Sequence, residues 1–254
     1  MAAPNPAHAS ADSADGPRFP STLAPDAYYE GLLDRLQTAL LPTLDPFFSS
    51  LSSLSSSSSS HPLVLELASG NGTHATLFTR SYPSLSIQPT ECDSFGVKRI
   101  NETVARDGAE RVRRAIRVDV MSDGDWEGLG RRLREEEGEG KRYDLVFGSN
   151  FLHMVPFPDA PHRIFRLLLT HSLLTPTAKL LIYGPFKSDT GFFSPSDAAF
   201  DKAIASRPSS YPLGLRSIDA LGRIAREEGW KLSERIGVAK GNWVLVFEQE
   251  GEGK

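Results

Sequence analysis

One segment of the 254-residue chain joins a carboxylate to two glycines at a spacing that can hold a small charged molecule. Glu66 lies in an apolar run, and Gly70 and Gly72 follow it after a few small residues. Glycines let the backbone approach a ligand closely, and a helix that starts just beyond them offers unpaired N–H groups. We therefore expect a buried strand, a tight turn, and a helix for which Thr73 is the N-cap.

Two kinds of ligand fit this segment. The residues from Gly70 to Ala75 match Gly-x-Gly-x-x-Gly/Ala, which is typical of dinucleotide sites. The acid at Glu66 instead matches Glu/Asp-x-x-x-Gly-x-Gly, the first motif of S-adenosylmethionine (SAM) methyltransferases. A carboxylate repels a pyrophosphate but attracts the cationic amino-acid end of SAM. The spacing favours SAM over a dinucleotide, and a purely structural turn is the remaining alternative.

Bulk composition argues against several classes of function. The net charge of −4 disfavours a nucleic-acid binder that relies on bulk electrostatics. The single cysteine, Cys92, rules out an intrachain disulfide and a Cys-based zinc cluster, and it fits a reducing compartment. The sequence has neither an apolar run of transmembrane length nor a signal-peptide pattern. We expect a cytoplasmic protein that binds a small molecule, but neither nucleic acid nor membrane.

Composition also divides the chain. Residues 1–22 are rich in Ala, Pro, Ser and Asp, which predicts a disordered tail. Residues 23–254 are expected to form one domain. It would begin with a helix over 26–41, ended by Pro42, that could cap a cofactor site. A second short helix could cover 44–54, and the serine run over 52–60 predicts a flexible linker.

Strand and helix patterns alternate after this linker, which is typical of a parallel sheet covered on both faces. We expect strands at residues 63–67, 84–88, 115–118, 143–148, 178–183, 231–236 and 243–248, and helices at 95–105, 124–140, 160–174, 196–206 and 217–228. The two closing strands can pair as a hairpin, which a NAD-binding Rossmann domain normally lacks. The pattern predicts the Rossmann-like α/β sheet of class I SAM methyltransferases, seven-stranded and parallel except for an antiparallel last strand.

Ligands of such sheets bind beyond the carboxyl ends of the strands. Glu91 after the second strand could accept hydrogen bonds from the ribose hydroxyls, with Asp93 as its rival; either could instead be a helix cap. After the third strand, Asp119 could bind the adenine amino group while Val120 packs on the ring. The predicted cofactor set is Glu66, Ala68, Gly70, Gly72, Glu91, Asp93, Asp119, Val120 and Asn150.

The end of the fourth strand is the expected place for chemistry. His153 is the candidate general base, because an unperturbed imidazole has a pKa close to neutral, and Tyr183 is its candidate helper. A histidine that only bonds a loop carbonyl is the alternative. The predicted substrate contacts are Tyr28, Tyr29, Phe186, Lys187 and Asn242. The remaining histidines show no metal-ligand spacing, so no metal site is expected.

The order and spacing of several short motifs match one known family. The motifs are residues 65–75, 88–91, 119–120, 150–154, 183–186, 200–201 and 214–216, and Asn242 before the last strand. Through them residues 63–247 resemble the methyltransferase-like protein 26 family, also known as domain of unknown function 938. The resemblance implies a class I methyltransferase fold and SAM binding, while the substrates of the family are poorly defined.

The chain departs from the family pattern in the segments expected to cover the substrate. Tyr28, Tyr29 and Glu30 replace an Arg-Asn-Lys run, Ser217 replaces an Asp, and Gly241 replaces the first Asn of a pair. The leading hypothesis is a SAM-dependent methyltransferase that acts on a small molecule. The alternatives are a SAM-binding protein of the same fold without methyl transfer, as a binding or partner subunit, and a NAD-type oxidoreductase.

Overall fold

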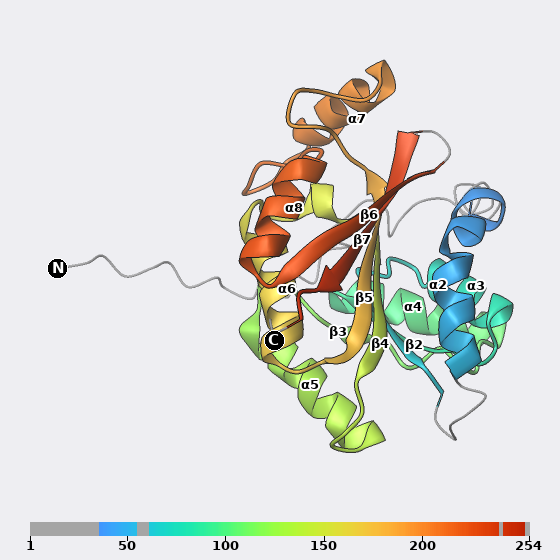
Figure 1. Ribbon diagram of the computed structural model, residues 1–254. Coiled ribbons are helices and arrows are strands. Elements are labelled where there is room, and N and C mark those ends of the chain that lie inside the picture. Colours follow the sequence, from blue (N-terminus) through green and yellow to red (C-terminus); the bar gives the residue numbers. More distant parts are fainter. Residues whose placement is uncertain (1–35, 55–60, 239–240, 252–254) are drawn as a thin grey trace.

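A seven-stranded sheet with the order β3-β2-β1-β4-β5-β7-β6 forms the centre of the protein (Figure 1). The structure is a computed structural model, and it describes residues 36–54, 61–238 and 241–251. The strands are β1 Leu63–Leu67, β2 Ser86–Glu91, β3 Ile116–Arg117, β4 Tyr143–Ser149, β5 Leu174–Pro185, β6 Trp230–Val238 and β7 Asn242–Gln249. Neighbouring strands are parallel except that β7 runs antiparallel to β5 and β6. The predicted sheet is confirmed.

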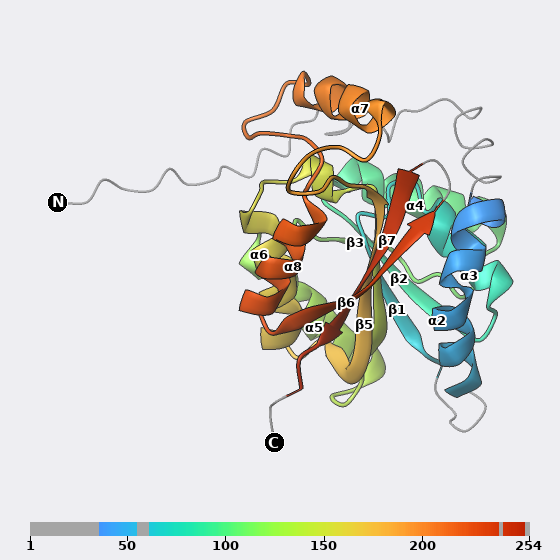
Figure 2. The same ribbon diagram turned by 45° about the horizontal axis from the view of Figure 1, so that its top comes forward.

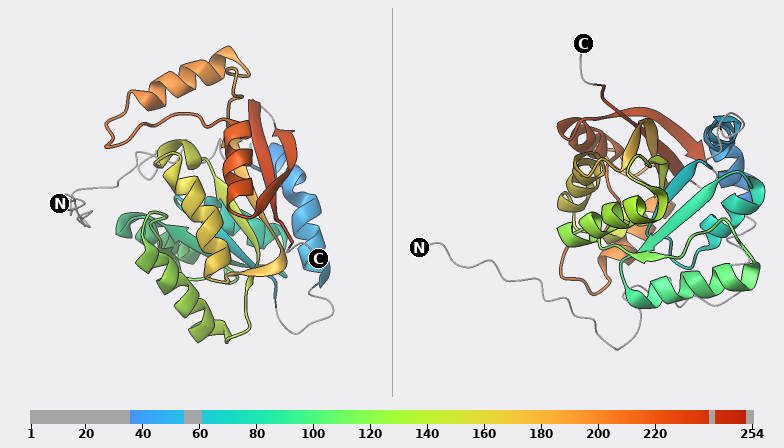
Figure 3. Two further views of the ribbon diagram at one scale, coloured as in Figure 1. Left: turned by 60° about the vertical axis from the view of Figure 1, so that its left-hand side comes forward. Right: turned by 90° about the horizontal axis from the view of Figure 1, so that it is seen from below.

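Helices cover both faces of this sheet (Figures 1 and 3). They are η2 Leu36–Leu40, α2 Leu41–Leu54, α3 Thr73–Ser81, α4 Ser94–Asp107, α5 Asp123–Glu137, η4 Leu152–Met154, α6 Asp159–Thr170, α7 Pro195–Ala205 and α8 Ile218–Glu227. In these views α2, α3 and α4 lie on one face, and α5, α6 and α8 lie on the other. Helix α7 stands apart at one end of the sheet (Figure 2). Within the described ranges no helix is both long and apolar enough to span a bilayer.

The helical segment before β1 differs from the expectation. Pro42 does not end a helix, because the π-helical turn η2 leads directly into α2 with Pro42 as its second residue. A proline is tolerated there since the N–H groups of the first turn need no helical partner. Helix α2 also includes Ser52 and Ser53 of the expected linker. The expected tail, residues 26–35 of the expected cap helix and the linker residues 55–60 lie outside the described residues.

Strand β5 begins earlier than expected and shortens the helix before it. The helix predicted over 160–174 ends at Thr170, and Ser172 adopts a left-handed conformation with a φ of 51°. This turn lets Leu174 join the sheet beside Tyr143. The apolar pattern of residues 173 and 174 therefore belongs to the sheet, although it also fits the helix period.

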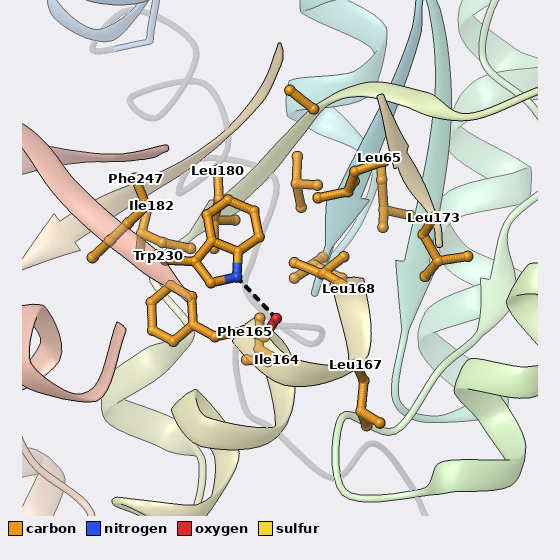
Figure 4. Close-up of a cluster of buried hydrophobic side chains, with 14 of the residues drawn as sticks. Leu65, Ile164, Phe165, Leu167, Leu168, Leu173, Leu180, Ile182, Trp230 and Phe247 are labelled. Carbon is orange, nitrogen blue, oxygen red and sulfur yellow. Dashed lines mark hydrogen bonds between the residues drawn. The ribbon is translucent and has the colours of Figure 1, made fainter. Parts of the chain in front are cut away.

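Each face of the sheet has its own hydrophobic cluster. Leu63, Leu65 and Leu67 of β1 point into the cluster under α5, α6 and α8, whereas Val64 points into the cluster under η2, α2 and α3. Figure 4 shows part of the first cluster, where the fully buried Trp230 donates its indole N–H to the Phe165 carbonyl at 2.9 Å. The alternation of β1 side chains sends Glu66 to the same face as Val64. An acid therefore points into an otherwise apolar layer.

We predict that Trp230→Phe lowers the free energy of unfolding by about 2 kcal/mol or more, because it leaves a cavity and an unpaired carbonyl. Urea titration followed by circular dichroism measures this loss. Phe95→Leu, at a side chain that is 37% exposed, is the control and should change stability by less than about 0.5 kcal/mol. Equal stability of the two variants would contradict the prediction.

Candidate cofactor site

The glycine loop (residues 68–72) joins β1 to α3 with a left-handed backbone. Ala68, Gly70 and Gly72 have φ angles of 53°, 63° and 81°, in the region that glycine enters without steric cost. Gly72 is the N-cap of α3, so the prediction of Thr73 as N-cap is wrong. The Asn71 side chain instead accepts hydrogen bonds from the N–H and hydroxyl of Thr73. The loop thus closes on itself before the helix begins.

The two glycines of the loop serve different purposes. A Cβ atom on Gly72 would lie 3.1 Å from Cγ2 of Ile100 on α4, so this glycine allows the loop to pack closely on its neighbour. A Cβ atom on Gly70 would meet no atom within 4 Å. The loop lies at the carboxyl end of β1, where the strand order reverses between β1 and β4, which is the usual ligand position of such sheets. Gly70 therefore presents bare backbone to the expected ligand.

Glu66 is the least satisfied polar side chain of this region. It is 2% exposed, and neither carboxylate oxygen has a hydrogen-bond partner. Burial raises its pKa to about 8, and the neighbouring Glu91 also acts in that direction. The closest basic group is His74 on α3, whose Nδ1 atom lies 3.6 Å from Oε1 of Glu66. A buried carboxyl group without partners matches a cationic ligand group such as the ammonium of SAM.

The two rival acids after β2 have different contacts. Glu91, the last residue of β2, accepts hydrogen bonds from the N–H groups of Gly70 and Cys92. Asp93 is the N-cap of α4 and accepts from the Gly96 N–H through Oδ1, while its buried Oδ2 has no partner. Glu91 therefore holds the glycine loop, and Asp93 combines its capping role with one oxygen that remains available.

Glu91, Cys92 and Asp93 also bring three potential metal-ligand atoms within 4.8 Å of one another. Both carboxylates are already engaged by backbone N–H groups. Burial also raises the pKa of the Cys92 thiol, with the charge of Glu91 adding to the effect, whereas a metal binds the thiolate. The three residues lie close together because Glu91 ends β2 and Asp93 is the N-cap of α4.

Asp119 and Val120 form an anchored turn after β3. Asp119 accepts a hydrogen bond from the Met121 N–H, and its own N–H donates to Asp125. The Val120 carbonyl accepts from the indole of Trp126, and its side chain packs against the core under α5. Both residues are half-buried. The turn is rigidly held at the sheet edge where the adenine was expected.

The segment after β4 places Asn150 and His153 at the same end of the sheet. Asn150 has a φ of 54° and donates its N–H to the carbonyl of Tyr183, the β5 residue beside Ser149. Gly184 permits this close approach, since a Cβ atom there would lie 3.2 Å from Oδ1 of Asn150. The β4 and β5 ends are thereby joined tightly.

His153 is 7% exposed, and its ring packs edge-on against Phe200 of α7 with centroids 5.5 Å apart. Burial lowers its pKa to about 4, and the charges of Arg216 and Arg207 contribute. The pKa of His153 is therefore well below that of an unperturbed imidazole. The imidazole is uncharged at pH 7 and is a weak base.

Tyr183 and His153 contact different groups. Tyr183 packs against the cluster under η2 and α2, on the opposite face from the Leu152 side chain that precedes His153. Among the predicted substrate contacts, Phe186 is 2% exposed and lies in the core. Lys187 lies over the ring of Phe192 at 5.5 Å, and Asn242 pairs with Pro185 at the start of β7. Tyr28 and Tyr29 lie outside the described residues.

Arg216 is a structural anchor to which the sequence assigned no role. Its buried guanidinium donates to the carbonyls of Leu152, Val155 and Pro212, and it lies over the ring of Phe157. Arg216 therefore ties the segment before α8 to the loop that carries His153. A buried arginine in a loop gives no periodic signal, so only its place in the matched motif at 214–216 marked it.

The architecture matches solved methyltransferases. The S-adenosylmethionine-dependent methyltransferase SibL has a TM-score of 0.61 at 17% identity, over 88% of this chain and 58% of SibL. An O-methyltransferase family protein from Burkholderia thailandensis gives 0.59 at 17%, over 91% and 62%. An O-methyltransferase family 2 protein from Planctomyces limnophilus, solved with apigenin, gives 0.59 at 17%, over 75% and 50%.

These likenesses establish the class of fold, that of the class I SAM methyltransferases. The chain spans about three fifths of the length of the first two solved proteins. A family model covers residues 43–249, which is most of the chain. The protein belongs to the family described as "Protein of unknown function (DUF938)".

We predict that Arg216→Met lowers the free energy of unfolding by about 2–3 kcal/mol, because three carbonyls lose a charged donor. Urea unfolding measures the loss. The matched control is Arg207→Met, at an exposed position, which should cost less than about 0.5 kcal/mol. A similar effect of both changes would show that Arg216 is not an anchor.

Proposed function

We propose that the protein is a SAM-dependent methyltransferase with a small-molecule acceptor. The observation that carries the proposal is the buried, unpartnered carboxyl group of Glu66 beneath a glycine loop with open space above Gly70. This pairing suits a ligand with an ammonium group and disfavours a pyrophosphate. The two solved neighbours named first are described as methyltransferases, which supports the same choice.

The residues of the candidate site fit the parts of this cofactor. Glu66 would receive the ammonium group, and the Gly70 backbone would lie against the amino-acid end. The free Oδ2 of Asp93 and the remaining acceptor capacity of Glu91 suit a ribose diol. Val120 offers an apolar surface to adenine, and Asp119 an acceptor for its amino group.

When bound, the cofactor supplies an electrophilic methyl group on a sulfonium. The protein's part is to hold the acceptor in line and to exclude water. His153 is uncharged at neutral pH and can receive a proton, yet its lowered pKa makes it a weak base. Acceptors that need little help to lose a proton, such as acidic phenols or thiols, fit this site better than alcohols.

The segment around α7 indicates what kind of acceptor is suitable. Phe192, Phe193 and Phe200 are 41%, 46% and 39% exposed, which is unusually high for phenylalanine. Phe200 contacts the His153 ring, and Phe193 lies 5.2 Å from Trp243 at the start of β7. One ring against the candidate base and two further exposed rings in the same segment favour an acceptor with an aromatic surface. One solved neighbour is described as a complex with apigenin.

We also propose a family branch, a cellular location and a range of partners for the protein. We place the chain in the methyltransferase-like protein 26 branch on the motifs quoted above. We place it in the cytoplasm because its only cysteine is a free thiol. We expect no nucleic-acid or membrane partner, in keeping with its net charge of −4.

One observation favours a second candidate, a SAM-binding protein without methyl transfer. His153 is buried and weakly basic, and Tyr183 packs on a different cluster. Calorimetry with SAM followed by mass spectrometry of a panel of phenols and thiols separates the two. Binding with turnover supports the transferase, and binding without turnover supports the second candidate. No binding at millimolar SAM would remove both.

We predict that Gly70→Ala weakens SAM binding tenfold or more, because its methyl group enters the space above the loop. The matched control is Gly108→Ala at the end of α4. Its φ of 61° is close to the 63° of Gly70, and a Cβ atom there also meets no atom within 4 Å. Both variants should lose about 1 kcal/mol of stability from backbone strain. Calorimetry should find normal affinity only for Gly108→Ala; equal affinities would contradict the role of the loop.

A further inference from the structure

Glu66 of the candidate cofactor site is paired with His74, a residue to which the proposed function gives no role. Both oxygens of Glu66 and Nε2 of His74 are buried and lack hydrogen-bond partners. The pair joins β1 to α3, with Nδ1 of His74 lying 3.6 Å from Oε1 of Glu66. The rings of Phe78 and Phe147 lie 5.9 and 5.6 Å from the imidazole. Two titratable groups thus face each other inside an apolar layer.

The groups around this pair do not neutralise a negative charge. Glu91 on β2 is an acid and opposes ionisation of Glu66, while only the Ser69 hydroxyl on the glycine loop acts in the other direction. Phe78 on α3 and Phe147 on β4 are apolar. No lysine or arginine of the described residues forms an ion pair with Glu66, and burial keeps His74 uncharged by lowering its pKa to about 4. Without a ligand, the low-energy state is a neutral acid beside a neutral imidazole.

We propose that Glu66 and His74 couple cofactor binding to the release of one proton. In the free protein the Glu66 carboxyl keeps its proton and directs it toward Nδ1 of His74. An incoming ammonium group makes the carboxylate the stable form, so the O–H bond of Glu66 breaks and the proton passes to solvent. His74 remains neutral and acts as a positioning residue. This inference rests on the proposed function, because it names how the same site takes its cationic ligand.

The coupling has a defined pH dependence. The pKa of Glu66 in the free protein is about 8 and falls when a cation binds beside it. Binding therefore tightens as the pH rises toward 8 and levels off above it, while the ligand ammonium stays charged. From a pKa of about 8, the affinity gain between pH 6 and 8 is about 50-fold. An ionised Glu66 in the free protein would give no such gain in this range.

The direct test is isothermal titration of the full chain with S-adenosylhomocysteine at pH 7, in buffers of different ionisation enthalpy. The dependence of the observed heat on the buffer counts the protons released. We expect about one proton for the wild type and none for Glu66→Gln, which resembles the protonated acid in shape and should fold. Wild-type binding without proton release would overturn the proposal.

The role of His74 is tested by two variants. His74→Asn keeps a polar atom near the position of Nδ1, and His74→Leu removes it. For S-adenosylhomocysteine binding, we expect His74→Asn to have the same pH midpoint as the wild type. We expect the midpoint of His74→Leu to differ by at least half a pH unit. Midpoints that match the wild type in both variants would exclude His74 from the pair.

A measurement without ligand separates this inference from the proposed function. Infrared difference spectroscopy between the free wild type and Glu66→Gln at pH 7 should detect one protonated carboxylic acid. If that band is present and S-adenosylhomocysteine does not bind, the proposed function fails while the buried neutral acid stands. If the ligand binds and the band is absent, the function stands and the proton coupling fails.

Discussion

The burial of the Glu66 carboxyl group within an apolar layer is the constraint on which the candidate site depends. The strand alternation that carries Leu63, Leu65 and Leu67 into one core sends Glu66 into the other. No described neighbour offers it a compensating charge at neutral pH. Such a group is unfavourable in a purely structural strand. It is understandable where a cationic ligand completes the site, and the backbone of the adjoining glycine loop is shaped to admit one.

The neighbouring elements hold that loop in place through contacts to its backbone. Glu91 accepts from the Gly70 N–H, Thr90 accepts from Ser69 through its carbonyl, and Ile100 packs on Gly72. These contacts come from β2 and α4, which lie beside β1. The loop geometry is therefore fixed by contacts within the protein, and a pre-ordered loop loses less entropy when it binds a ligand.

The region proposed for the acceptor is organised around a different anchor. Arg216 joins the loop after β4 to the segment before α8, and Asp201 of α7 accepts from the Leu215 N–H next to it. These bonds hold α7 at the end of the sheet (Figure 2), where Phe200 of α7 contacts the His153 ring. The glycine loop and the region around α7 thus rest on separate sets of interactions. Substitutions around α7 can therefore change that region while the glycine loop is unchanged.

Local patterns in the sequence determined the sheet, its antiparallel last strand and the glycine loop. Hydrophobic periodicity and glycine spacing act over a few residues, so they can be interpreted without neighbours. They failed where two elements compete for the same residues. Leu174 fits both a helix and a strand, and the turn at Ser172 assigns it to β5. The N-cap of α3 was misplaced at Thr73 because Asn71 offers the oxygen that Thr73 was expected to supply.

Only the tertiary structure decided which polar groups are left without partners. The sequence marks Glu66 and His153 as candidates, yet their charge states follow from atoms on other strands and helices. His74 supplies the imidazole beside Glu66. Burial and the charges of Arg216 and Arg207 lower the pKa of His153. Burial and charge act through space rather than along the chain. The sequence therefore determined which residues are candidates for a ligand site, and the packing of distant elements determined how strongly Glu66 and His153 hold a proton.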